Sequence, residues 1–290
     1  MAHQERKKIM KTWKKIVLGV SLISLFLGGG LVAWGYSQGG LTDLQNKTIS
    51  EQDYVKKEVK DFNKIDIKSS SYNVLIKNGE VDKATLSYYQ KTKNPIDTSV
   101  KDGQLTINDN NSELDSTSNK HINFFGLKDL VRLSTLNKEV RNKTIVITLP
   151  KKQTIDFLKV DLATGNLDLS NSTIKQADIN LNVGDLTFTK MIVSNLKANL
   201  DVGSVDSDHT LFTNSDLSIA MGDYSGDNLI FNGHNKLDVT SGDIEIALKD
   251  YTLNVQADSH SGEVDITNNL KISKDNTLTI TSDLGDITVE

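Results

Sequence analysis

The stretch "LDVTSGDIEIAL", residues 237–248, contains the pattern that decides the fold. Apolar and polar residues alternate on both sides of a glycine and an acid, Gly242 and Asp243. Alternation with a period of two residues is typical of β-strands that bury one face. We therefore expect one strand to end at a corner at Gly242, and a second strand to start directly after it.

Similar stretches recur along the second half of the chain. Consecutive glycines of this pattern are 19 or 20 residues apart, except for the last interval of 23 residues. Regular spacing of this kind is the sequence signature of a repeat architecture. The aligned glycines are Gly165, Gly184, Gly203, Gly222, Gly242, Gly262 and Gly285.

This repeat predicts an all-β fold, a β-solenoid with coils of about 19–20 residues. A single coil cannot bury its apolar side chains, whereas coils stacked at the spacing of paired strands can share one core. Strand-like segments also occur in residues 62–149, and we expect them to form the first coils or a cap on the stack. The repeat domain is expected to span residues 61–290, with an insertion at residues 109–143.

Two segments and the recurrent glycine corner resemble the β-strand-repeat putative-adhesin family of bacteria, over residues 60–290. The segments are "FNKIDIKSSSYNVLIKNGEVDKATLSYYQ", residues 62–90, and "IVITLPKKQTIDFLKVDLATGNLDLS", residues 145–170. This family is a domain of unknown function, and its members often carry one N-terminal membrane helix, especially in Gram-positive bacteria. The resemblance implies a non-catalytic, adhesin-like binding role at the cell envelope. Because some members sit near envelope-stress regulators, the alternative is an accessory of the envelope stress response that acts through a membrane partner. The family defines no catalytic or cofactor-binding residues.

The N-terminal region has the pattern of a membrane anchor. Residues 16–36 contain no charged residue, and as a helix they would be about 31 Å long, close to the thickness of a bilayer core. The basic residues 1–15 precede this segment, so the positive-inside rule places them in the cytoplasm and the repeat domain outside the cell. A cleaved signal peptide is the alternative, but its apolar core is usually shorter. Residues 37–60 are expected to be a linker that could include a short helix.

Charge is distributed unevenly along the chain. The whole chain has a net charge of −5, and residues 1–15 contain six Lys or Arg residues and one acid, so the remainder carries −10. A strongly negative exported part argues against nucleic-acid binding and favours cationic partners, including basic peptides, as a long-range bias. The chain has no cysteine, which excludes disulfides and thiol chemistry.

The residue after each aligned glycine usually has a side-chain oxygen. One interpretation is a structural corner in which these oxygens accept backbone hydrogen bonds. The other is a row of Ca²⁺ ligands, because hard cations prefer several oxygens. Asn and Ser interrupt the acids, which favours the structural interpretation, and we expect no metal or other cofactor. The residues are Asn166, Asp185, Ser204, Asp223, Asp243, Glu263 and Asp286.

The repeat breaks its own pattern in residues 204–228. Ser207 and Gly226 replace an apolar residue of the second strand, and several acids and one histidine lie nearby. A hollow lined by carboxylates would suit a polysaccharide-cleaving solenoid enzyme, but a solvated loop explains the pattern equally, and we expect no catalytic residues. This third hypothesis rests on Asp201, Asp206, Asp208, His209, Asp223 and Asp227.

The insertion contains the apolar segment "HINFFGLKDLVRL", residues 121–133. It could cover an open end of the solenoid, as such ends require. It could instead dock on the membrane or on a partner protein. Phe124, Phe125 and Leu127 are the candidate interaction residues of this segment.

Overall fold

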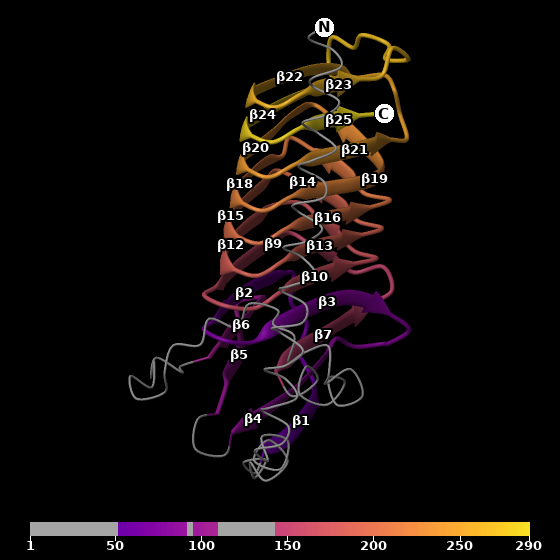
Figure 1. The fold of residues 1–290 in the computed structure, drawn as a ribbon. Helices are drawn as coiled ribbons and strands as arrows, with labels where there is room; N and C mark the ends of the chain where they lie inside the picture. Colours follow the sequence, from indigo (N-terminus) through magenta and orange to yellow (C-terminus); the bar gives the residue numbers. More distant parts are fainter. Residues whose placement is uncertain (1–51, 92–94, 110–142) are drawn as a thin grey trace, which may run out of the picture. The chain divides into compact units, whose positions relative to one another are not determined.

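A computed structural model describes residues 52–91, 95–109 and 143–290, and all its named elements in these ranges are β-strands. From residue 157 onward the chain winds as stacked coils (Figure 1). A complete coil has three sides, which we call first, second and third in chain order. The aligned glycines lie between the first and the second side. The prediction of an all-β solenoid is confirmed.

The first side is one sheet. Its strands, in spatial order, are β5 (Asp97–Lys101), β6 (Gln104–Asn108), β2 (Lys64–Ser69), β9 (Phe157–Leu162), β12 (Ala177–Val183), β15 (Leu196–Val202), β18 (Asp216–Met221), β20 (His234–Ser241), β24 (Thr277–Leu284) and β22 (Asn254–Ser261). All neighbours are parallel except β5 and β6.

The other two sides follow the same stacking order. The second side contains β1 (Gln52–Glu58), β4 (Thr85–Lys91), β7 (Thr144–Pro150), β3 (Asn73–Gly79), β10 (Leu167–Ser170), β13 (Leu186–Thr189), β16 (Val205–Asp208), the first half of β19 (Tyr224–Asn232), β21 (Ile244–Leu248), β25 (Ile287–Val289) and β23 (Val264–Ile266). The third side contains β8 (Thr154–Ile155), β11 (Thr173–Ile174), β14 (Ile192–Ser194), β17 (Leu211–Thr213) and the second half of β19.

Neighbouring coils superimpose residue on residue. Ala177 of β12 pairs with Leu196 of β15 on the first side, and Leu167 of β10 pairs with Leu186 of β13 on the second. Both pairs differ by the repeat length of 19, so inward side chains stack in straight columns. These columns form one continuous apolar core inside the coils.

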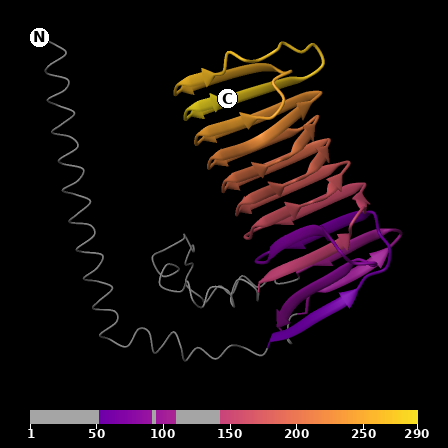
Figure 2. The ribbon, with the colours of Figure 1, turned by 90° about the vertical axis from the view of Figure 1, so that its right-hand side faces the viewer.

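The coils do not stack in sequence order at the two ends of the solenoid. At the C-terminal end, β24 lies between β20 and β22, and β25 lies between β21 and β23 (Figures 1 and 2). Coils that follow one another in sequence therefore do not always pair, although the regular repeat suggests that they would. The reason is apolar content: Leu278 and Ile280 of β24 are fully buried, whereas Val255 and Ala257 of β22 are only partly buried. The more apolar coil occupies the internal place.

At the N-terminal end, too, the coils do not stack in sequence order. Strand β2 lies between β6 and β9, and strand β3 lies between β7 and β10. The outer coil is then covered by antiparallel strands, β5 against β6 and β4 against β7. These antiparallel strands form the cap that an open solenoid end requires.

Strand β1 corrects the expected linker boundary. It lies within residues 37–60 and pairs antiparallel along all of β4, so the repeat domain starts by residue 52 and not at residue 61. Val55 packs against the core, while Lys56 and Lys57 are exposed. Lysines on an outermost strand discourage pairing with another chain, so a polar segment can serve as the edge of this sheet.

Several expectations concern residues outside the described ranges. They are the cytoplasmic tail 1–15, the anchor 16–36, most of the linker 37–60, most of the insertion 109–143, and the candidate residues Phe124, Phe125 and Leu127. Among the residues that are described, no helix is long and apolar enough to cross a bilayer.

Each glycine corner touches the corner of the adjacent coil. At Gly203, φ is +148°, and an added Cβ would lie 1.9 Å from the carbonyl oxygen of Gly184. The equivalent distance at Gly285 is 2.0 Å to the oxygen of Gly242, and at Gly262 it is 2.0 Å to the oxygen of Gly285. Only glycine fits these positions, because a side chain would push neighbouring coils apart.

We predict that Gly203→Ala lowers the free energy of unfolding of the full-length protein by about 3 kcal/mol or more, since both φ and the close carbonyl oppose a Cβ. Chemical denaturation in detergent measures this change. Ser225→Ala, on the exposed face of β19, is the matched control and should change stability little. A loss at Gly203 no larger than that of the control would contradict the close contact.

Candidate functional site

The residues after the glycines form a hydrogen-bonded ladder across the coils. The side chain of each residue accepts the backbone N–H of its counterpart in the next coil. Asp223 Oδ1 accepts from Asp243 N at 2.9 Å, Asp243 Oδ1 accepts from Asp286 N at 2.9 Å, and Asp286 Oδ1 accepts from Glu263 N at 2.8 Å. The same contact runs through Asn73, Asn166, Asp185 and Ser204 at the other end of the column. These contacts give the oxygens the structural use that the corner interpretation expects.

We predict that Asp243→Ala lowers the free energy of unfolding by about 1 kcal/mol, because the N–H of Asp286 loses its acceptor. Asp243→Asn keeps an oxygen at this place, as Asn166 does naturally, and should match the wild type. Thermal or chemical unfolding compares the two variants. Asp206→Ala is the control, since Asp206 lies on the same side outside the ladder. Equal stability of the Ala and Asn variants would rule out the role of the acceptor.

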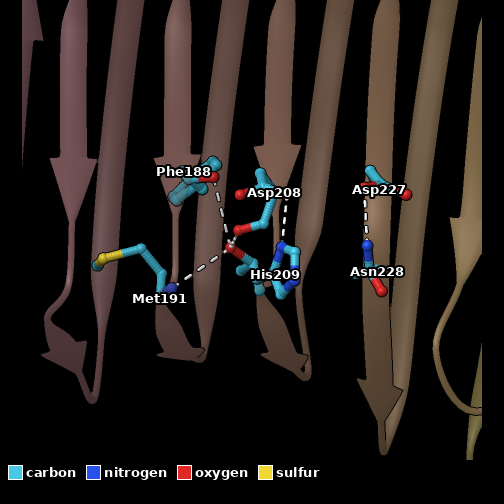
Figure 3. Close-up of polar contacts among 7 residues, drawn as sticks. Phe188, Met191, Asp208, His209, Asp227 and Asn228 are labelled. Carbon is cyan, nitrogen blue, oxygen red and sulfur yellow. Dashed lines mark hydrogen bonds and ion pairs between the residues drawn. The ribbon is translucent and has the colours of Figure 1, made fainter.

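The structure brings three of the predicted site residues together at the corner between the second and third sides. Asp208 and Asp227 are paired neighbours on β16 and β19, and His209 follows Asp208 (Figure 3). His209 Nδ1 lies 2.6 Å from Asp208 Oδ1, and Asn228 Nδ2 donates to Asp227 Oδ2 at 2.7 Å. One ligand-type atom from each of Asp208, His209 and Asp227 lies within 4.8 Å of the others.

This trio offers one imidazole and two carboxylates, a donor set that suits borderline divalent cations such as Zn²⁺. His209 and Asp227 are exposed, and Asp208 is half-buried. The contacts with Asn228 and between His209 and Asp208 account for the arrangement without an ion. Other predicted acids lie elsewhere: Asp201 is on β15, before the glycine corner, and Asp223 belongs to the ladder.

The break in the repeat at Ser207 and Gly226 is neither a groove nor a solvated loop. Both residues are buried, and Leu229 fills the space beside Gly226, where an added Cβ would lie 2.4 Å from Leu229 Cδ1. Aromatic rings from neighbouring strands fill the rest: Phe188 and Phe212 pack with ring centroids 5.3 Å apart, and Phe212 and Phe231 with centroids 5.8 Å apart. The remaining cavity beside Phe212 and Tyr224 is about 10 Å³, the size of one water molecule.

The outer face of the second side carries acids and no lysine or arginine on its strands from β10 onward in the stack, a feature that the sequence analysis missed. We consider the second-side strands β10, β13, β16, the first half of β19, β21, β25 and β23. None of them carries a lysine, arginine or histidine, and neither do the ladder positions that precede them. We call the acids of this surface the acidic face: Asp168, Asp185, Asp206, Asp208, Asp223, Asp227, Asp243, Glu245, Glu263, Asp265, Asp286 and Glu290. Burial raises the pKa of the Asp168 carboxyl; a hydrogen bond with Thr187 opposes this rise, and the charge of Asp185 adds to it.

A column of exposed apolar residues borders the acidic face. It occupies the position directly before the glycine, where Val183 pairs with Val202 and Val202 pairs with Met221. The column continues through Ser241 to Leu284. Val183, Val202, Met221 and Leu284 are 36–58% exposed, and we call these four residues the apolar ridge.

A family model described as Toastrack DUF4097 matches residues 62–290. The chain belongs to the Toastrack DUF4097 family. This result confirms the resemblance inferred from the sequence. Curated proteins give no match to this chain.

Solved structures similar to this Toastrack chain include three of low sequence identity. A "putative cell adhesion protein" from Clostridium sporogenes is 17% identical, with a TM-score of 0.38, and the match covers 82% of this chain and 99% of that one. A "putative adhesin" from Bacteroides fragilis is 16% identical, with a TM-score of 0.36 and coverage of 83% and 97%. A "putative lipid binding protein" from Parabacteroides distasonis is 11% identical, with a TM-score of 0.34 and coverage of 83% and 98%.

Proposed function

We propose that this Toastrack protein is a non-catalytic binding protein of the cell envelope. Residues 16–36 anchor it in the cell membrane as a single span, the N-terminus is cytoplasmic, and the repeat domain is outside the cell. The observation that carries the proposal is the second side of the solenoid. It presents aligned columns of exposed side chains, held in fixed register by paired strands and by the corner ladder. A rigid, regular surface of this kind suits binding.

The surroundings of the candidate acids support binding over catalysis. The cavity beside Phe212 has room for about one water molecule, and none of these acids lines it. The carboxylates of Asp208 and Asp227 lie on an exposed corner and are hydrogen-bonded to His209 and Asn228.

An accessory role in the envelope stress response remains the second proposal, and the two roles differ in the partner. An adhesin-like protein binds a molecule foreign to its own cell, whereas a stress accessory binds a neighbouring protein of the same membrane. The second role is supported by the N-terminal sequence, basic in residues 1–15 and apolar in residues 16–36. An anchor of this kind would place the chain beside other membrane proteins.

We predict that a photo-crosslinking residue on the second side, in place of Ser225, captures a partner in intact cells, and that mass spectrometry identifies it. The matched site is Ser218 on β18, which lies on the first side and should capture less. A captured protein of the same membrane would support the stress role, and a foreign molecule would support the adhesin-like role.

Two results would contradict a binding role altogether. The first is the absence of any specific crosslink at either position. The second is turnover of peptidoglycan or another glycan by the full-length protein that is lost in the Asp206→Asn/Asp208→Asn variant.

A further inference from the structure

We propose that the acidic face and the apolar ridge together bind a basic, amphipathic peptide segment of another polypeptide. The inference rests on the binding role proposed above, and it names the surface and the chemistry of the partner. Neither feature alone identifies a partner. The two features together identify one, because they lie side by side and a partner that contacts both must have cations and apolar residues on one face.

The two surfaces are adjacent along the length of the ridge. Val183 and Asp185 are separated only by Gly184, so the ridge and the first column of acids are about 7 Å apart. From Val183 to Leu284 the ridge spans four strand spacings, roughly 19 Å. A helix of that length has about 13 residues. The length of the ridge therefore matches that of a short helical peptide segment.

The charge of the second side differs from that of the first side. On the first side, Lys159 lies 3.6 Å from Asp161, and Lys236 forms an ion pair with Asp238. These lysines neutralise nearby acids. The strands of the acidic face themselves carry no cation, and Lys190, His209 and Lys249 lie only at its border, the corner to the third side. The acids therefore outnumber the nearby cations, and their field favours a cationic partner.

The same charge disfavours other occupants of this surface. A second copy that used the same face would bring like charges together, which costs free energy across an interface. An anionic lipid surface would be repelled for the same reason. An acidic or neutral peptide would gain only the contact with the ridge.

Complementary charge mainly accelerates association and sets specificity, while the buried ridge supplies apolar contact. Removing either part should therefore weaken binding, and added salt should weaken it through the charges alone. Polycations without an apolar face should bind less well than amphipathic ones.

The test uses the full-length protein in nanodiscs of zwitterionic lipid and a fluorescent 14-residue peptide of leucine and lysine with helical amphipathic spacing. Fluorescence anisotropy measures the dissociation constant, with empty nanodiscs as the blank. Two further peptides serve as controls, one with the same composition in scrambled order and one with glutamate in place of lysine. The ridge variant is Val202→Ser/Met221→Ser, and the acid variant is Asp206→Asn/Glu245→Gln, which leaves the corner ladder intact.

Matched variants remove equivalent groups elsewhere. Ile192→Ser/Ile272→Ser removes two exposed apolar side chains away from the ridge. Asp216→Asn/Asp258→Asn removes two acids of the first side. We expect the ridge and acid variants to raise the dissociation constant about fivefold or more, and the matched variants to stay within about twofold of wild type. Raising ionic strength from about 0.05 to about 0.3 M should weaken the wild type more than the acid variant.

The inference is overturned if the wild type does not bind the amphipathic peptide, if the control peptides bind equally, or if the matched variants lose as much affinity as the ridge and acid variants. It is also overturned if sedimentation shows a dimer that only the ridge variant disrupts. The photo-crosslinking experiment separates this failure from failure of the proposed function. A partner captured through another surface preserves the binding role, whereas the absence of any captured partner ends both.

Discussion

The close contact between glycine corners is the constraint on which the stack depends. At each corner a Cβ would lie about 2 Å from a carbonyl oxygen of the adjacent coil, for example 1.9 Å at Gly203 and 2.1 Å at Gly222. The strands on both sides of the corner can pair at normal hydrogen-bond distances only while this contact exists. The straight inward columns, the repeat length and the corner ladder all require that the corners superimpose. The column of glycines ends at Tyr72, whose carbonyl oxygen contacts the Gly165 position at the N-terminal end.

Much of this arrangement was predictable from the sequence. The alternation of apolar and polar residues and the interval of 19–20 residues between glycines can both be read directly from it. Alternation identifies Leu237, Val239, Ile244 and Ile246 as buried residues, and all four are buried. The 19-residue interval also brings Asp208 beside Asp227. The order of the coils at the ends was not predictable in the same way. Every coil has the same corner and the same alternation, so local patterns do not specify which coil pairs with which. Total burial decides it, and the apolar β24 takes the internal place.

The features that the sequence pattern does not reveal lie at corners, where the chain turns and the direction of the side chains changes. Counted from the buried Leu181, strict alternation places Val183 inside, but the chain turns at Gly184 and leaves Val183 45% exposed. Alternation alone therefore does not reveal the apolar ridge. The position of His209 has a similar cause. It adopts a left-handed conformation, φ 49°, as do Asn171 and Asn228 at equivalent corners. Asparagine and histidine are among the non-glycine residues enriched in this conformation, whereas the same turn at Lys190 has no such signal.

The acids of the second side fall into two groups, and the fold accounts for only one of them. Asp185, Asp223, Asp243 and Asp286 accept backbone N–H groups, so their oxygens stabilise the stack. Asparagine performs the same role at Asn166, which shows that the charge is not needed for the contact. The other group includes Asp206, Glu245 and Asp265, whose side chains point away from the core and lie outside the ladder. In this column a neutral residue separates neighbouring acids: Ser225 lies between Asp206 and Glu245, and Thr288 lies between Glu245 and Asp265. A surface that keeps charge at positions where the ladder does not use it is better explained by a cationic partner than by the requirements of the solenoid.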